Sequence, residues 1–133
     1  MAEQKIEIMA PVGSYESLAA ALNAGCDSVY FGIEQLNMRA RSSINFTLED
    51  LREIVTRCNR VGVQSYLALN TVLYDHDINL MKRIVDQAKE DGVTAIIGAD
   101  HAVMAHCRAI GMPLHISTQV NITNIETVEF YAV

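Results

Sequence analysis

Several patterns that mark common classes of protein are missing from this sequence. No apolar run approaches the roughly 20 residues that a membrane-spanning helix needs, so we expect no insertion into a membrane. Residues 1–5 lack the basic start of a signal peptide, and no long apolar core follows them. Both absences favour a cytoplasmic protein.

Cysteine is scarce, and its spacing argues against a metal site built from this chain alone. Cys26, Cys58 and Cys107 are odd in number, lie far apart and form no CxxC pair. A closed zinc site needs four ligands, typically at close spacing. We therefore expect the three thiols to be small apolar core residues, and we expect no cofactor within this segment.

Catalytic motifs with a fixed spacing are also missing. The sequence contains no Walker loop, no HExxH, no clear Ser-His-Asp set and no pair of carboxylates at a useful spacing. Residues 11–14, after the first expected strand, do not form the GxGxxG of a dinucleotide site. The formal net charge of −6 argues against binding of nucleic acid through the overall electrostatic field.

The sequence does contain a repeated junction between a helix and a strand. Four glycines (Gly25, Gly62, Gly92 and Gly111) each follow a helix-like stretch, and an apolar run begins within a few residues of each. Glycine supplies the left-handed conformation that closes a helix, and serial helix-to-strand units build a parallel sheet. The chemistry of a parallel sheet lies at the carboxyl ends of its strands.

Hydrophobic periodicity and capping residues predict the individual elements. The expected strands are residues 5–11, 28–32, 63–70, 93–98 and 114–120. The expected helices begin at these caps: Ser14, Thr47, Asp75 or Asp77, Asp100, and Thr123 or Asn124. A long loop is expected from residue 33 to residue 46.

An open doubly wound sheet and a barrel both fit five such α/β units. Strands of an open sheet are buried on both sides and apolar throughout, whereas here polar residues such as Gln64 and His115 occupy one side only. Since one side of a barrel strand faces a shared interior, we predict part of a TIM-type (β/α) barrel. The side chains predicted to face this interior are Glu7, Met9, Ser28, Tyr30, Gln64, Tyr66, Asn70, His115, Ser117 and Gln119.

A complete barrel takes about 250 residues, and this sequence stops in its fifth expected helix without a closing cap. We therefore expect residues 1–133 to be the N-terminal portion of one (β/α)8-type barrel domain, whose partner is the remaining part of the same protein. Unpaired strand edges invite pairing with other chains, so the isolated segment is also expected to self-associate.

The loops after the strands should share one face, and five residues there are candidates for substrate binding. They are Arg39, Asn70, His115, Gln119 and Asn121. A guanidinium group matches the geometry of carboxylates and phosphates, so Arg39 and Arg41 predict an anion clamp, although two solvated arginines also explain the pattern. His115 could act in acid–base catalysis or bind substrate, or it could be a satisfied core histidine.

Other polar residues have competing structural roles. Ser14 could be proposed as a nucleophile, but helix capping already explains it, and no histidine is near it in sequence. Asp100 follows an expected strand and could belong to the site, but it could equally cap the helix that begins there. His76, His101 and His106 lie around helix starts and faces, and we expect them to be structural or solvent-exposed.

Five segments, in order along nearly the whole chain, resemble the collagenase-like peptidase family U-32, whose catalytic type is unassigned. They are IMAPVGS at residues 8–14, AGCDSVYFG at 24–32, NMRA at 37–40, LNT at 69–71 and HISTQVNITN at 115–124. The resemblance implies a β/α barrel, in agreement with the alternation, and a protease as the parent protein. It implies no particular catalytic residue, because the family has no accepted set.

Other members of this family support hydroxylation of tRNA, of ribosomal RNA or of a quinone ring, and carry cysteines for an iron–sulfur cluster. The resemblance places those cysteines mostly beyond residue 133. One hypothesis is therefore a segment of a collagenase-like protease that acts on peptides and is inactive alone. The second is part of an iron–sulfur-dependent hydroxylation enzyme, with Arg39 and Arg41 on RNA phosphates. The third is an inactive structural fragment that self-associates.

Overall fold

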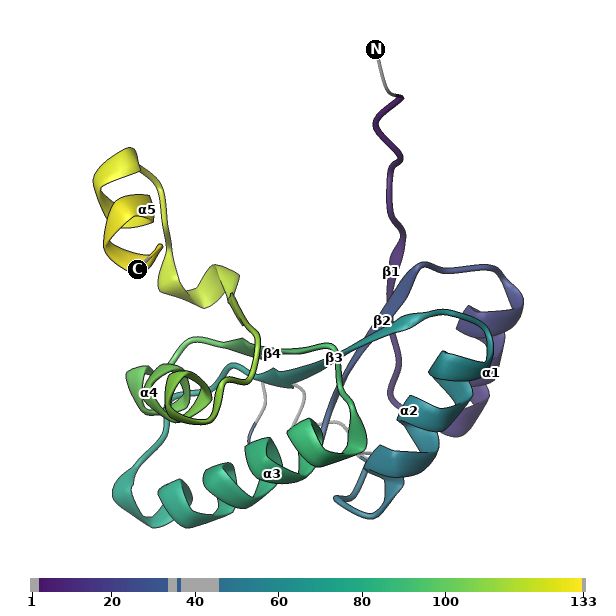
Figure 1. The fold of residues 1–133 in the computed structure, drawn as a ribbon, viewed down its shortest axis with the longest axis horizontal. Helices are drawn as coiled ribbons and strands as arrows, with labels where there is room; N and C mark the ends of the chain where they lie inside the picture. Colours follow the sequence, from purple (N-terminus) through teal and green to yellow (C-terminus); the bar gives the residue numbers. More distant parts are fainter. Residues whose placement is uncertain (1–2, 34–35, 37–45, 133) are drawn as a thin grey trace.

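Five parallel strands alternate with helices along the chain (Figure 1). This computed structural model describes residues 3–33, 36 and 46–132. The strands are β1 (Met9–Pro11), β2 (Ser28–Gly32), β3 (Gln64–Leu69), β4 (Ala95–Gly98) and β5 (Leu114–Ile116). The helices are α1 (Tyr15–Asn23), α2 (Asp50–Arg60), α3 (Ile78–Asp91), α4 (His101–Ile110) and α5 (Ile125–Tyr131), with 3₁₀ turns η1 (Asp75–Asp77) and η2 (Thr118–Val120).

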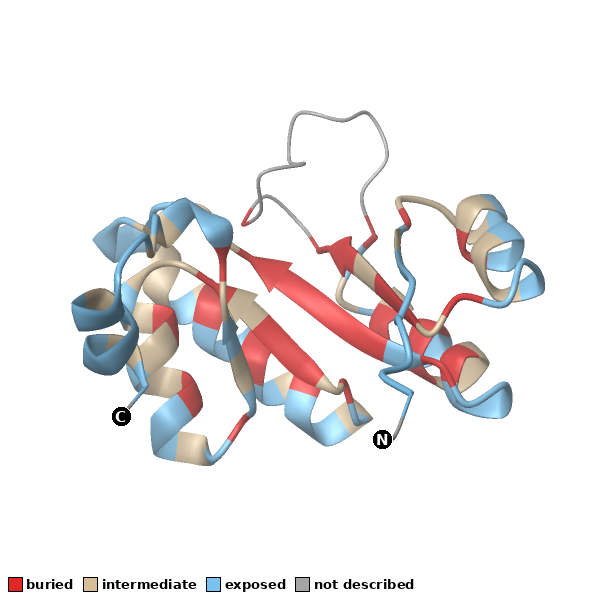
Figure 2. Cartoon of the chain, turned by 90° about the horizontal axis from the view of Figure 1, so that it is seen from above, coloured by how far each residue is buried: buried red, intermediate tan, exposed pale blue. Residues whose placement is uncertain are grey.

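The strand order confirms the predicted barrel-type fold. The strands pair in sequence order from β1 to β5, all parallel, without the reversal of order that defines a doubly wound sheet. Helices α2 and α3 lie beneath the sheet in Figure 1. Figure 2, seen from above, shows the opposite face of the sheet with no described helix across its centre. The arrangement is that of the first five units of a TIM-type barrel, with an open inner face.

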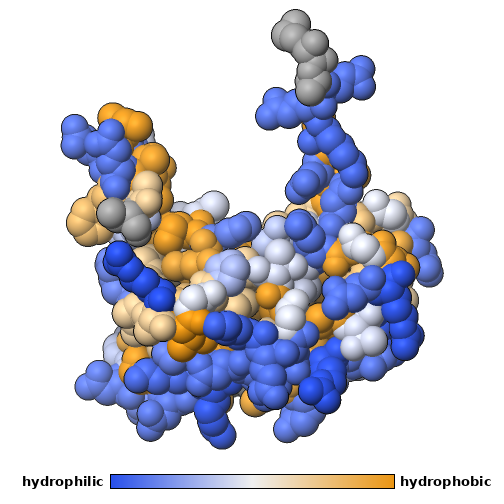
Figure 3. All heavy atoms as spheres, in the orientation of Figure 1, coloured by the Kyte–Doolittle hydropathy of each residue, from blue (hydrophilic) through white to orange (hydrophobic). Residues whose placement is uncertain are grey.

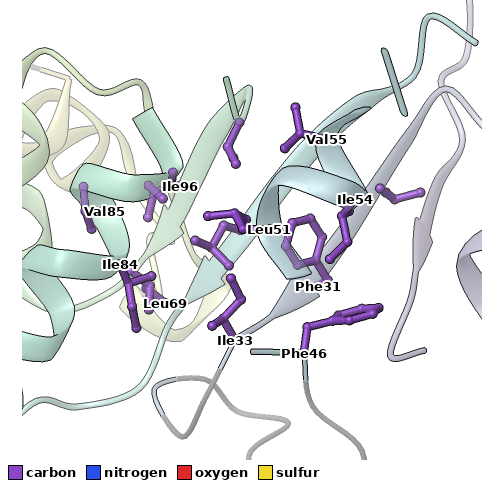
Figure 4. Packing of buried hydrophobic residues seen from close by; sticks show 14 of the residues in the cluster. Phe31, Ile33, Phe46, Leu51, Ile54, Val55, Leu69, Ile84, Val85 and Ile96 are labelled. Atoms are coloured by element: carbon purple, nitrogen blue, oxygen red, sulfur yellow. The ribbon is translucent and has the colours of Figure 1, made fainter. Parts of the chain in front are cut away.

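The core lies between the sheet and the helices on its outer face (Figure 4). Phe31 of β2 and Leu69 of β3 are fully buried there, as are Leu51 and Ile54 of α2 and Ile84 of α3. These helical residues recur at intervals of three and four, so each helix places one apolar stripe on the sheet. Truncating such a side chain to alanine costs about 2–5 kcal/mol.

Four of the predicted strands are shorter in the structure, and the first and the fifth differ most. Strand β1 forms only at Met9–Pro11, because it pairs with β2 alone and residues before it are exposed. Glu7 therefore lies before the strand, and the prediction that it faces the barrel interior as part of the strand was wrong. Strand β5 ends at Ile116, after which the chain enters η2 and Asn121 adopts a left-handed φ of 58°. The prediction of a strand up to residue 120 was wrong.

Most predicted caps are found in place. Ser14 Oγ accepts from Ser17 N, Asp100 from Ala102 N and Asn124 from Thr127 N. Thr47 differs, since helix α2 begins at Asp50, whose carboxylate accepts from the Thr47 backbone N–H. Among the described residues, no helix is both long and apolar enough to cross a membrane.

Candidate binding site at the carboxyl ends of the strands

The inner face of the sheet carries two rings that meet across a strand. Tyr66 of β3 and His115 of β5 have ring centroids 5.1 Å apart. The Tyr66 hydroxyl donates to Gln64 Oε1 at 3.1 Å, so β3 orients its own ring. Tyr66 is buried, yet it is not part of the hydrophobic cluster under the helices. Both rings lie on the face that the alternation predicted to be the interior.

A pocket of about 330 Å³ lies where β3, β4 and β5 end. Its lining residues come from the three loops that follow these strands and from α4 and α5: Asn70, Thr71, Val72, Ala99, Asp100, His101, Gln119, Val120 and Tyr131. Asn70 Nδ2 donates to Gln119 Oε1 at 3.4 Å, which joins the loop after β3 to η2. The structure thus brings together two of the predicted substrate-binding residues.

The turn after β5 holds Gln119 in place. Ser117 Oγ donates to Gln119 Oε1 and accepts from the Gln119 backbone N–H. Asn121 Nδ2 donates to the Gln119 carbonyl at 3.3 Å. Asn121 lines a neighbouring pocket of about 380 Å³ and is absent from the lining of the first pocket. Its contact with Gln119 is therefore a supporting one.

Asp100 joins two of the loops that form the pocket. Its Oδ1 accepts from Ala102 N at 2.8 Å, as expected of a cap, and its Oδ2 accepts from Leu73 N at 3.0 Å. No local pattern predicts the second bond, because 27 residues separate the partners. His101, expected to be structural or solvent-exposed, lines the pocket and stacks on Tyr131 with centroids 6.1 Å apart.

The other residues considered as site candidates have different outcomes. Arg39 and Arg41 lie outside the described residues, so the anion clamp stays a prediction. His115 is exposed on the inner face and is not among the pocket's lining residues. Ser14 caps α1 in a reciprocal pair with Ser17, as the structural alternative predicted.

A polar pair fixes the same edge of the sheet near β1 and β2. The Tyr15 hydroxyl donates to Asp50 Oδ1 at 2.7 Å, linking the first residues of α1 and α2. Burial and this bond raise the pKa of Tyr15 to about 12. Burial alone would raise the pKa of Asp50, but hydrogen bonds from Thr47 and Tyr15 outweigh it and lower that pKa. The phenol and the carboxylate therefore form a neutral donor and a charged acceptor.

The three cysteines do not fit an iron–sulfur cluster. Each is a buried free thiol, and among the described residues no group of three or more histidine, cysteine or acidic side chains could hold a metal ion. Burial raises the pKa of Cys58 and of Cys107 to about 11 and also raises that of Cys26. The raised pKa values keep these thiols protonated in the folded segment.

Comparison with known sequences gives a consistent set of relatives. The sequence model described as Peptidase family U32 matches residues 13–133. A collagenase from Porphyromonas gingivalis is 58% identical over 95% of this chain and 30% of its own length. An uncharacterized protease from Methanocaldococcus jannaschii is 35% identical over 96% of the chain and 31% of its own length. The tRNA hydroxylation protein P1 of Bacillus subtilis is 28% identical over 96% of this chain and 31% of its own length.

The chain thus spans about 30% of the length of the curated relatives it matches. Solved structures agree on the fold. The U32 peptidase Mk0906 superposes with a TM-score of 0.68 over 92% of this chain and 52% of its own, at 11% identity. HMG-CoA lyase from Bacillus subtilis gives a TM-score of 0.62 over 81% of this chain and 42% of its own, at 17% identity.

Proposed function

Because this chain belongs to peptidase family U32, we propose that it is the N-terminal part of a collagenase-like protease and is inactive without the rest of that protein. The observation that carries the proposal is the high identity to a collagenase, which is about twice the identity to the tRNA hydroxylation protein. The site residues are proposed to bind substrate, and the catalytic residues stay unassigned.

The geometry of the pocket supports a peptide as the substrate. The carboxamide of Gln119 accepts hydrogen bonds from Asn70 and Ser117 through its oxygen, and its Nε2 group is a donor suited to a peptide carbonyl. None of the described residues that line the pocket is a lysine or an arginine, which phosphate recognition would favour. His115 and Asn121 flank this site, and we propose that they orient the substrate and Gln119 respectively.

The exposed edges support the proposal that the rest of the barrel completes this segment. A hollow of about 620 Å³ separates α4 and β5 from α5, and Met112, Leu114 and Phe130 line it. Ile125 and Val128 of α5 are also exposed. Figure 3 shows α5 and the N-terminal segment as two projections with a hollow between them. Further strands and helices would bury these apolar surfaces. Each Å² of apolar surface that is removed from water stabilises the fold by about 25 cal/mol.

Hydrolysis of unfolded collagen by the full-length protein tests this proposal. We expect gelatin to be cleaved, and we expect Asn70→Ala and Gln119→Ala to lower kcat/KM by about tenfold or more, since each removes hydrogen bonds to the substrate. His76→Ala, far out on an exposed turn, is the control. A full-length protein that cleaves neither gelatin nor short peptides would contradict the proposal.

The second candidate is a hydroxylation enzyme that depends on an iron–sulfur cluster. The similarity to the tRNA hydroxylation protein over nearly the whole chain favours it. The cluster would have to be held by residues outside this segment, because Cys26, Cys58 and Cys107 do not fit one. Anaerobic purification of the full-length protein with an iron and sulfide assay separates the two candidates. A brown protein without gelatin-cleaving activity would favour hydroxylation.

A further inference from the structure

We propose that the pocket at the ends of β3, β4 and β5 is a specificity subsite that takes one uncharged side chain of a bound peptide. This inference rests on the proposed function. The walls supply apolar contacts from Val72, Ala99 and Val120 and neutral polar groups from Asn70 and Gln119. A volume of about 330 Å³ leaves room for a side chain of ordinary size.

Asp100 is the one carboxylate among the described lining residues, and its oxygens already accept hydrogen bonds. Both oxygens of Asp100 accept backbone N–H groups, one from the start of α4 and one from Leu73. The positive end of the α4 dipole further offsets its charge. An entering lysine would have to compete with these donors, and an entering carboxylate would lie beside Asp100. Since burying an unpaired charge is costly, the pocket favours a neutral occupant.

Gln119 supplies the polar contact that orients the backbone of the peptide whose side chain enters the pocket. Its Oε1 accepts from Ser117 Oγ and from Asn70 Nδ2, so the amide oxygen is used within the protein. Its Nε2 group is then the donor that the wall offers to a peptide carbonyl. The stacked rings of His101 and Tyr131 also line the pocket and add flat contact surface. One hydrogen bond and a mainly apolar wall define the subsite.

Charge introduction tests the subsite in the full-length protein. The probes are three unfolded peptides that differ at one position, which carries valine, lysine or glutamate. We expect the wild-type protein to bind the valine peptide at least about tenfold more tightly than the others, as measured by fluorescence anisotropy. Val120→Lys should move the preference to the glutamate peptide, because the new ammonium pairs with it.

Matched variants keep the test decisive. Val61→Lys adds the same charge at an exposed position at the amino end of β3 and should leave the preference unchanged. Thr71→Lys is a second variant of the lining, for use if Val120→Lys fails to fold. Gln119→Glu removes the donor and should weaken binding of the valine peptide. Equal binding of the three peptides by the wild-type protein would overturn the subsite.

Binding and cleavage separate this inference from the proposed function. If Val120→Lys changes peptide preference while no peptide is cleaved, the subsite stands and the protease proposal fails. If gelatin is cleaved but neither lysine variant of the lining alters the preference, the subsite fails and the protease proposal stands.

Discussion

Tyr66 and His115 meet on the inner face of the sheet although β4 lies between their strands. Their rings are tilted by 37° with centroids 5.1 Å apart. Ala95 of β4 pairs in register with Tyr66, whereas Ile97, two residues further along β4, pairs with His115. The contact between β3 and β5 therefore runs diagonally across β4, past the small side chain of Ala95.

Enlarging the residue between these rings should destabilise the protein. Ala95→Leu places a branched side chain at a buried position beside Tyr66, and overpacking of this kind costs about 1–3 kcal/mol. Urea denaturation monitored by circular dichroism measures the loss. His115→Ala in the same background should recover part of it by opening space. An Ala95→Leu protein with unchanged stability would show that the rings are not held in contact.

Removing the Asp100 carboxylate should loosen the loop after β3. Asp100→Ala deletes two hydrogen bonds, to Leu73 N and Ala102 N, and a lost cap alone costs about 0.5–2 kcal/mol. Hydrogen exchange should accelerate at both amides. Asp100→Asn keeps one carbonyl acceptor and should lose less. Faster exchange at Ala102 alone would mean that the bond to Leu73 contributes nothing.

The cysteine thiols should resist modification in the folded protein. Burial raises the pKa of Cys58 and Cys107 to about 11, so the reactive thiolate is rare at pH 8. The raised pKa values of Cys58 and Cys107 also stabilise the folded protein, because the folded state holds the thiol proton more tightly than the unfolded state. This contribution to the free energy of unfolding is complete below the unfolded thiol pKa of about 8.5. It is lost as the pH rises through the folded pKa.

Labelling with a thiol reagent at pH 8, with and without urea, measures this protection. We expect little reaction until the protein unfolds. Cys58→Ser and Cys107→Ser variants identify the thiols that react. Rapid labelling of Cys58 in the native protein would contradict the burial described here.

Residues 1–133 expressed alone should self-associate. The β1 edge and the segment before it are exposed, with Ile6 86% and Ile8 62% accessible. Lysine at such an edge opposes strand pairing, so Ile8→Lys should shift the protein towards the monomer. Sedimentation velocity measures the distribution. Val61→Lys, away from the edge, should have no such effect. A strictly monomeric wild-type segment would remove this prediction.

Local patterns were enough to predict most elements, because they depend on neighbours within a few residues. Ser14, Asp100 and Asn124 cap their helices as predicted, since a cap needs only its own next turn. Polar alternation around Tyr66 identified the inner face of the barrel. The length of strand β5 was overestimated, because residues 118–120 form a 3₁₀ turn. Ser117 caps this turn, and the left-handed Asn121 ends it.

The sequence alone determined the order of the units, their caps and the choice of a barrel, because each follows from periodicity and short-range hydrogen bonds. Only the tertiary structure decided which side chains share a pocket. Asn70 and Gln119 are 49 residues apart, and Leu73 reaches Asp100 across 27. Such contacts depend on the register of β3 against β4 and on the path of each loop, which no local pattern encodes. For the same reason, the sequence does not predict that His101 lines the pocket.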